Sequence, residues 1–169
     1  MAGLDRPCTL KLRARMARWS LMAIELHTPA EHFAVVSLPL ACYRELLGAI
    51  SSCECFVSVT RDVDEVSLII AEVEWLLLAD RWPHSHVVSG RRLIRFDTVL
   101  EFSIVGFLAE VARILAEAGI SILAISTFRT DALLVEDASF DRAVSLLRES
   151  SILKKLPGIA GQSERELHE

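Results

Sequence analysis

The sequence predicts an α+β fold, in which antiparallel strands form a sheet and helices cover one of its faces. Two adjoining segments carry this prediction. Leu108, Val111, Ala112 and Leu115 recur at helical spacing, and Gly119 follows the last of them, where a left-handed helix end is favoured. Residues 120–125 then contain five apolar residues and one serine, a composition that is typical of a buried strand.

The flanking residues extend this pattern to most of a known supersecondary unit. Residues 128–130 form a predicted tight turn, and residues 132–135 form the strand that follows it. Residues 91–96 predict a further strand upstream, and apolar residues at helical spacing in 140–147 predict a second helix. The order strand, helix, strand, strand, helix is most of a ferredoxin-like βαββαβ unit. Its fourth strand would come from the first half or from the tail, and the sequence does not decide between them.

The first half of the chain predicts strands with little helix. We expect strands at residues 19–26, 32–38, 53–60 and 65–73, and one short helix within residues 42–50. The apolar character of the last strand continues to Leu78.

The chain is expected to contain two small domains. Residues 19–79 form the predicted first domain and residues 88–150 the second, with extensions at 1–18 and 151–169. Residues 80–90 hold a proline, a glycine, two histidines and two serines without periodicity, so they predict a linker.

The bulk composition restricts the classes of partner. Hydrophobic residues make up 52% of the 169 residues, and the mean hydropathy of +0.39 favours apolar surface hidden in a homo-oligomer, most simply a dimer. No stretch approaches the ~18 apolar residues of a membrane-spanning helix, so no membrane is expected. A net charge of −5 argues against a nucleic-acid partner. Four cysteines without a credible signal peptide favour the cytoplasm.

Neither a catalytic motif nor a regular metal site is evident in the sequence. It lacks a Gly-x-Ser-x-Gly elbow, a phosphate-binding glycine loop and a His-Glu-x-x-His helix, so we expect a protein that is not an enzyme and has no cofactor. Cys53, Cys55, His84 and His86 could supply a tetrahedral zinc site. Their spacing is not that of a zinc module, and cysteine is also a common buried apolar residue. We therefore predict no metal.

Several short phrases of the sequence resemble the ACT domain family, in particular small proteins that carry a tandem ACT pair. The phrases occur in the same order as in that family, over roughly residues 20–150, and lie at residues 32–39, 57–70, 101–106, 116–122 and 125–135. The resemblance implies two ferredoxin-like ACT units with antiparallel sheets. It also implies a sensor of small molecules, most often free amino acids, similar to the regulatory part of aspartate kinases.

The first candidate site lies at the start of the helix near residue 107. Gly106 opens this helix, whose first N–H groups are a natural site for the carboxylate of an amino acid. The resemblance places the ligand at the same loop, which adds Phe102, Ser103 and Val105 to the predicted contacts. Val105 stands where the family often has threonine, which removes one hydroxyl group. The alternative is that Gly106 only allows the helix to pack closely on the sheet.

The second candidate site surrounds the turn between the two strands of the second half. Its predicted ligand contacts are Ser126, Thr127, Thr130 and Asp131. Asp131 is suited to pair with the ammonium group or a basic side chain of an amino acid, as the resemblance to arginine-sensing members implies. The alternative is a turn aspartate that bonds to its own backbone.

These observations predict a non-catalytic regulatory protein that binds a small molecule at an ACT domain or subunit interface. The alternative is an oligomerisation or protein-interaction module without a functional ligand site. The sequence names neither the ligand, nor the regulated protein, nor the exact oligomeric state.

Overall fold

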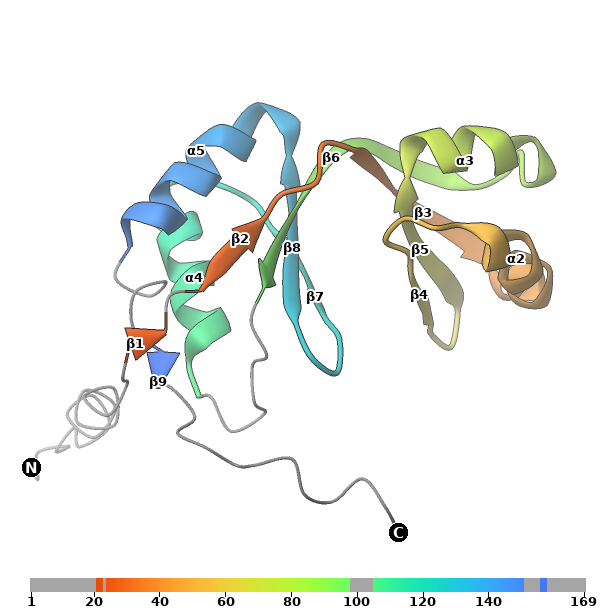
Figure 1. Cartoon of the computed structure of the whole chain (residues 1–169). Coiled ribbons are helices and arrows are strands. Elements are labelled where there is room, and N and C mark those ends of the chain that lie inside the picture. Colours follow the sequence, from red (N-terminus) through yellow and green to blue (C-terminus); the bar gives the residue numbers. More distant parts are fainter. Residues whose placement is uncertain (1–20, 23, 98–104, 151–155, 158–169) are drawn as a thin grey trace, which may run out of the picture.

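The computed structural model describes residues 21–22, 24–97, 105–150 and 156–157. It confirms the α+β class, since one curled antiparallel sheet carries the helices (Figure 1). The strands are β1 (Leu21–Met22), β2 (Glu25–His27), β3 (His32–Pro39), β4 (Ser58–Arg61), β5 (Glu65–Ala71), β6 (His86–Asp97), β7 (Leu123–Ser126), β8 (Asp131–Glu136) and β9 (Leu156–Pro157). The helices are α2 (Tyr43–Ala49), α3 (Glu72–Leu78), α4 (Phe107–Glu117) and α5 (Asp137–Glu149), with 3₁₀ turns at Leu40–Cys42, Ile50–Ser52 and Ala79–Arg81.

Two βαββαβ units share the long strand β6. The first unit runs from β3 through α2, β4, β5 and α3 into the start of β6, and its strand order is β4-β5-β3-β6. The second unit uses the end of β6, then α4, β7, β8 and α5. Strand β3 pairs with residues 86–92 of β6, and β8 pairs with residues 91–95. Each unit therefore has the ferredoxin-like arrangement that the sequence predicts for the second half.

The fourth strand of the second unit comes from the N-terminal segment. Strand β2 lies antiparallel to the end of β6, with Leu26 opposite Phe96 and His27 opposite Arg95. Ile24, just before β2, is 5% exposed and packs in the core of the second unit. The first unit is thus inserted between the last strand of the second unit and the rest of it.

The sheet bends where the two units meet. The register between β3 and β6 shifts between Phe33 and Val35, and Gly90 on β6 has a φ of 71°. The Gly90 N–H donates a hydrogen bond to the Glu72 carboxylate at the start of α3. Figure 1 shows α4 and α5 at one end of the molecule and α2 and α3 at the other, with the β7–β8 and β4–β5 hairpins extending to the same side of the bend.

Apolar side chains fill both faces of the sheet. Strand alternation points Leu133 and Val135 toward α4 and α5, and Ala132 and Leu134 toward the helix-free face. The first unit has a separate core beneath α2 and α3 that includes Trp75. The third cluster, on the helix-free face, joins β3, β5, β6 and β8, and consists of Phe33, Ile69, Ala71, Leu93, Ala132 and Leu134.

Three expectations for the first half are corrected. The predicted strand at 65–73 ends at Ala71, and residues 72–78 form α3, so the prediction of little helix is wrong. Trp75 is buried and the acidic Glu72 and Glu74 favour a helix start, whereas the apolar run alone fits either element. Only residues 58–60 of the predicted strand at 53–60 lie in β4, and residues 86–90 of the predicted linker belong to β6.

The domain limits predicted from the sequence stay a prediction. A division at residues 79 and 88 cuts the chain near the bend, but β6 runs through it as one continuous strand.

Candidate functional site

Gly106 sets the start of α4 by its backbone conformation. Its φ of 92° lies in the left-handed region, which residues with a side chain rarely adopt. A Cβ atom built at this position meets nothing within 4 Å. The positive φ therefore favours glycine here, and among the described residues no close contact with the sheet requires it. The next residue, Phe107, is 3% exposed and packs edge-on against Phe96.

The first turn of α4 has no side-chain cap from the described residues. The Gly106 carbonyl accepts the first helical hydrogen bond, from the Glu110 N–H at 3.0 Å, but no side chain bonds to the N–H groups before it. Such N–H groups carry the positive end of the helix dipole. Val105 is 67% exposed beside them. The predicted contacts Phe102 and Ser103 lie outside the described residues.

The turn between β7 and β8 uses two of its predicted contact residues to hold its own backbone. The Thr127 hydroxyl accepts hydrogen bonds from the N–H groups of Arg129, at 3.3 Å, and Thr130, at 3.0 Å. The same hydroxyl lies 3.1 Å from the Thr130 hydroxyl, and the Thr127 N–H donates to the Thr130 carbonyl. Ser126 lies opposite Asp131 in the ladder. Thr127 and Thr130 thus have a structural role in closing the turn.

Asp131 takes no part in closing this turn. It is half-buried, and its carboxylate forms no hydrogen bond or ion pair with any residue that the structure describes. The expected alternative, a turn aspartate bonded to its own backbone, is therefore not seen within the described part of the chain. The carboxylate remains available for a cation.

The start of α4 and the β7–β8 turn lie at the same end of the second unit. Strand β6 is antiparallel to β8, and β8 is antiparallel to β7, so the C-terminal ends of β6 and β7 lie at the same end of the sheet. Helix α4 begins beyond the end of β6, and Figure 1 shows its first turn at the same end as the hairpin turn. Val105, Gly106 and Asp131 thus lie toward the same end of the second unit, and a shared site there stays a prediction.

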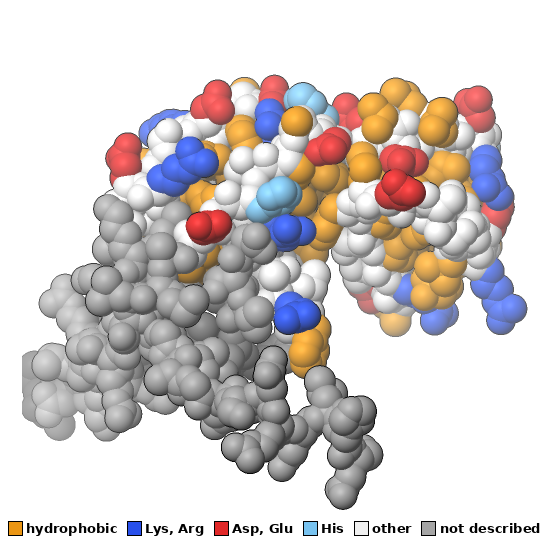
Figure 2. Space-filling view, viewed as in Figure 1, with side chains coloured by type: hydrophobic (Ala, Val, Ile, Leu, Met, Phe, Trp, Pro, Cys, Tyr) orange, Lys and Arg blue, Asp and Glu red, His pale blue; other side chains and the backbone are white. Residues whose placement is uncertain are grey.

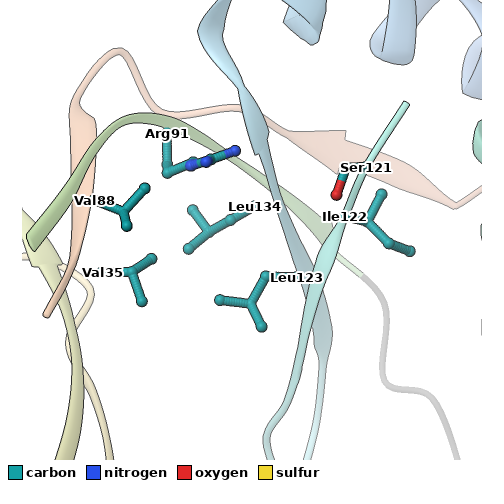
Figure 3. A pocket seen from close by; sticks show the side chains of 7 residues that line it. All are labelled: Val35, Val88, Arg91, Ser121, Ile122, Leu123 and Leu134. Atoms are coloured by element: carbon teal, nitrogen blue, oxygen red, sulfur yellow. The ribbon is translucent and has the colours of Figure 1, made fainter. Parts of the chain in front are cut away.

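A second concave region, which the sequence analysis missed, lies on the helix-free face near the bend. A hollow of about 210 Å³ is lined by β3, β6, β8 and the start of β7 (Figure 3). Its side chains include Val35, Val88, Arg91, Leu123 and Leu134. No motif marks these residues, because they come from four distant segments and most are apolar.

The Cys53 thiol lies beside the Glu74 carboxylate. Burial, and next the negative charge of Glu74, raise the pKa of the Cys53 thiol above its usual range, and the sulfur lies 3.6 Å from Glu74 Oε2. His84 and His86 are exposed on the turn before β6 and at its start. Among the described residues, no group of three His, Cys, Asp or Glu side chains is placed to hold a metal ion.

The fold and the family comparison together place the second unit in a known class. Two ferredoxin-like units joined through one sheet define a tandem α+β domain pair. The family model of the ACT domain matches residues 87–149, so the second half of the chain is an ACT domain. No curated protein matches the sequence significantly.

Solved structures share the tandem arrangement over most of the chain. A protein from Agobacterium tumefaciens is 27% identical and has a TM-score of 0.59, covering 75% of this chain and 88% of its own. The ligand-free regulatory subunit of aspartate kinase from Thermus thermophilus is 8% identical, with a TM-score of 0.61, covering 76% of this chain and 98% of its own. The aspartate kinase of Clostridium acetobutylicum is 14% identical, with a TM-score of 0.62, covering 80% of this chain and 36% of its own. At such identities the two kinase structures establish the fold.

Within the described residues, no helix has the length and apolar character needed to span a membrane.

Proposed function

We propose that this chain is a non-catalytic regulatory protein that binds a small molecule, a free amino acid, at the ACT domain of its second half. The proposal rests on the arrangement of groups at one end of that domain. There, α4 begins at Gly106 without a side-chain cap from the described residues, and the Asp131 carboxylate lacks a partner among them. An amino acid brings a carboxylate for the helix N-terminus and an ammonium group for Asp131.

The structural neighbours support a regulatory role. One of them is the regulatory subunit of an aspartate kinase, which the present fold covers almost completely. Ligand binding would stabilise one arrangement of the two units or of two subunits, and so change the population that a partner protein meets. A cytoplasmic location agrees with the free thiols of Cys42, Cys53 and Cys55.

Thermal unfolding with a panel of the twenty amino acids tests this function. A ligand at a hundred times its Kd adds about 2.7 kcal/mol, which raises the midpoint by roughly 5–10 °C for a chain of this size. Asp131→Asn is expected to abolish the shift because the ammonium loses its partner. Asp64→Asn is the matched control, since Asp64 lies in the corresponding β4–β5 turn of the first unit. A panel without any shift, or an equal loss in both variants, would contradict the proposed site.

A second candidate function, an oligomerisation module, is favoured by one surface of the first unit. On α3, Val73, Leu76 and Leu77 form an apolar stripe at helical spacing and are 64%, 74% and 80% exposed. Figure 2 shows hydrophobic side chains at the surface over this helix. Burying each such side chain contributes about 1.5–3 kcal/mol. Exposed apolar side chains that gather on one face mark protein contacts more often than isolated ones do. The stripe supports a homodimer, with or without a ligand.

Light scattering after size-exclusion chromatography tests this surface. Leu76→Asp with Leu77→Asp is expected to shift a dimer to monomer without unfolding it, because neither side chain belongs to the core. Val63→Asp is the control, since Val63 is 79% exposed in the β4–β5 turn. If the double variant keeps the mass of the wild type, the α3 stripe is not the subunit contact. A dimer that no amino acid stabilises would favour the interaction module over the sensor.

A further inference from the structure

The hollow on the helix-free face, described above, lies apart from the proposed amino-acid site. The start of β7 forms one of its walls, whereas the β7–β8 turn lies at the other end of that strand. The opposite wall is formed by Val35 on β3 of the first unit and by Val88 on the shared strand β6. Figure 3 shows these side chains on one side of the space and Leu123 and Ile122 on the other. A molecule in the hollow would touch both units across the bend.

The walls and floor of the hollow are made of branched aliphatic side chains. Leu134 is 1% exposed, whereas Val88 and Leu123 are 49% and 43% exposed. Two large apolar groups thus remain in contact with water on either side of a buried floor. Covering them with an aliphatic group is favourable in proportion to the apolar area that leaves water. The walls therefore fit a short, branched hydrocarbon chain.

The one charged group in the lining is the Arg91 guanidinium. Figure 3 shows the Arg91 side chain extending over the hollow from β6 toward Ser121. Its Nη1 atom lies 3.2 Å from the Glu136 carboxylate, whose side chain is 60% exposed. An arginine has five N–H donors in a planar fork, so this single ion pair leaves donors for a second acceptor. The lining itself holds no carboxylate, and the Glu136 carboxylate beside it is already paired with Arg91.

We infer that this hollow binds a small branched aliphatic monocarboxylate, with its carboxylate on Arg91 and its hydrocarbon chain among Val35, Val88 and Leu123. The volume of 210 Å³ equals that of roughly seven water molecules in the liquid, which is below the range of drug-sized ligand pockets. A free amino acid fits less well, because its ammonium group would lie near the Arg91 guanidinium, and the nearby Glu136 carboxylate is already paired with that guanidinium. Occupation of the hollow would hold the two units at one bend angle.

Methyl NMR with isovalerate as the probe tests the inference. In protein with labelled Val and Leu methyl groups, isovalerate is expected to shift the signals of Val35, Val88 and Leu123 in a saturable manner. Valine, which is isovalerate with an added ammonium group, and 3-methylbutanol, which removes the charge, are expected to bind at least tenfold more weakly there. If isovalerate causes no saturable shift of these methyl signals in the wild-type protein, the proposal is wrong. Equal binding of the alcohol would overturn the role of the carboxylate, and tighter binding of valine would assign the hollow to amino acids.

Matched variants separate the hollow from general effects on the fold. Arg91→Gln is expected to weaken isovalerate binding at least tenfold, whereas Arg81→Gln, which removes another half-exposed paired arginine, leaves it within twofold. Val88→Phe fills the hollow and should abolish binding. Val87→Phe is its control, because Val87 is similarly exposed but points to the other face of β6. Similar losses in variant and control would contradict the assignment.

Two further variants keep the test decisive. If Val88→Phe does not fold, Leu123→Ala removes one wall without adding bulk, and it should weaken binding. Unchanged binding by Leu123→Ala would overturn the site. Asp131→Asn is expected to leave isovalerate binding within twofold, since Asp131 does not line the hollow. The failure of the amino-acid proposal and the failure of this one are therefore distinguishable.

Discussion

Gly106 shows how one residue fixes the geometry of a candidate site. Its left-handed φ turns the chain into α4, and the first N–H groups of the helix follow directly. Among the described residues nothing lies close enough to exclude a side chain at this position, so the positive φ is the observed reason for glycine. The sequence already indicated a helix start here, but only the structure separates the two roles of glycine.

Gly106→Ala is expected to destabilise the protein by about 1–2 kcal/mol, because a left-handed conformation costs roughly that much for a residue with a Cβ. The free energy of unfolding in urea measures the effect. Gly48→Ala is the control, since Gly48 lies inside α2 with nothing within 4 Å of an added Cβ. That substitution should leave stability unchanged or raise it by up to about 1 kcal/mol. An equal effect at both positions would show that Gly106 is not strained.

At the scale of the element, α4 combines a buried face with an ionic outer face. Val111 and Leu115 are fully buried, whereas Arg113 bonds to Glu110 and Glu117 at 2.6 Å each on the exposed side. The hydrogen bond from Arg113 lowers the pKa of Glu110. The periodicity of the apolar residues predicted this helix well, because packing on one side and solvation on the other follow the same spacing.

This lowered pKa predicts a pH dependence of α4. A carboxyl group whose pKa falls on folding stabilises the protein above its unfolded-state pKa, and this stabilisation is lost as the pH falls through the folded-state pKa. Glu110→Gln should therefore be slightly less stable than wild type at neutral pH. The difference should vanish in acid, and also at high salt because the pair is exposed. Unfolding curves at several pH values measure it, and a difference that grows in acid would contradict the assignment. Glu149→Gln, on the exposed end of α5, serves as the control.

Helix α3 shows where the sequence pattern failed at this scale. Residues 75–78 form a continuous apolar run after Glu72 and Glu74. Such a short run fits a strand or a helix equally well. The helix forms because β5 ends at Ala71 and Trp75 packs into the first core, where it stacks on Trp82. This leaves Val73, Leu76 and Leu77 on the outer face.

At the scale of the whole molecule, strand β2 joins the beginning of the chain to the second unit. Ile24 and Leu26 pack with Ile94, Phe96 and the helices α4 and α5. The first unit can therefore transmit a change to the second through both β2 and β6. A contact between His32 Nε2 and Asp137 Oδ1, at 3.1 Å, adds a polar link between the start of β3 and α5.

Ile24→Ala tests this completion of the second unit by the N-terminal segment. The substitution removes a buried side chain and is expected to cost about 2–5 kcal/mol. Hydrogen exchange should accelerate at the amides of α4, β7 and β8 more than at those of α2 and β5. Val63→Ala, at an exposed position, should change neither region. Faster exchange in the first unit alone would contradict the strand assignment.

The sequence by itself determined the local elements of the second half and their ferredoxin-like order. Helical spacing and the glycine helix end are local signals, so they can be read without knowledge of the fold. The buried strand predicted at residues 120–125 is wrong in its burial, because the strand there is β7 (Leu123–Ser126), which lies at the edge of the sheet and is largely exposed. The short phrases likewise indicated the ACT family, and the family comparison confirms it for residues 87–149. The position of Gly106 at a helix start followed from the same local pattern.

Only the tertiary structure decided which distant segments meet. The fourth strand of the second unit, the sharing of β6 and the hollow beside Arg91 all depend on pairing between residues far apart in sequence. Hydrogen bonding along a strand edge is nearly independent of sequence, so the pairing of β2 with β6 leaves little trace in either segment. The bend at Gly90 then fixes which faces meet, and this is a property of the assembled sheet.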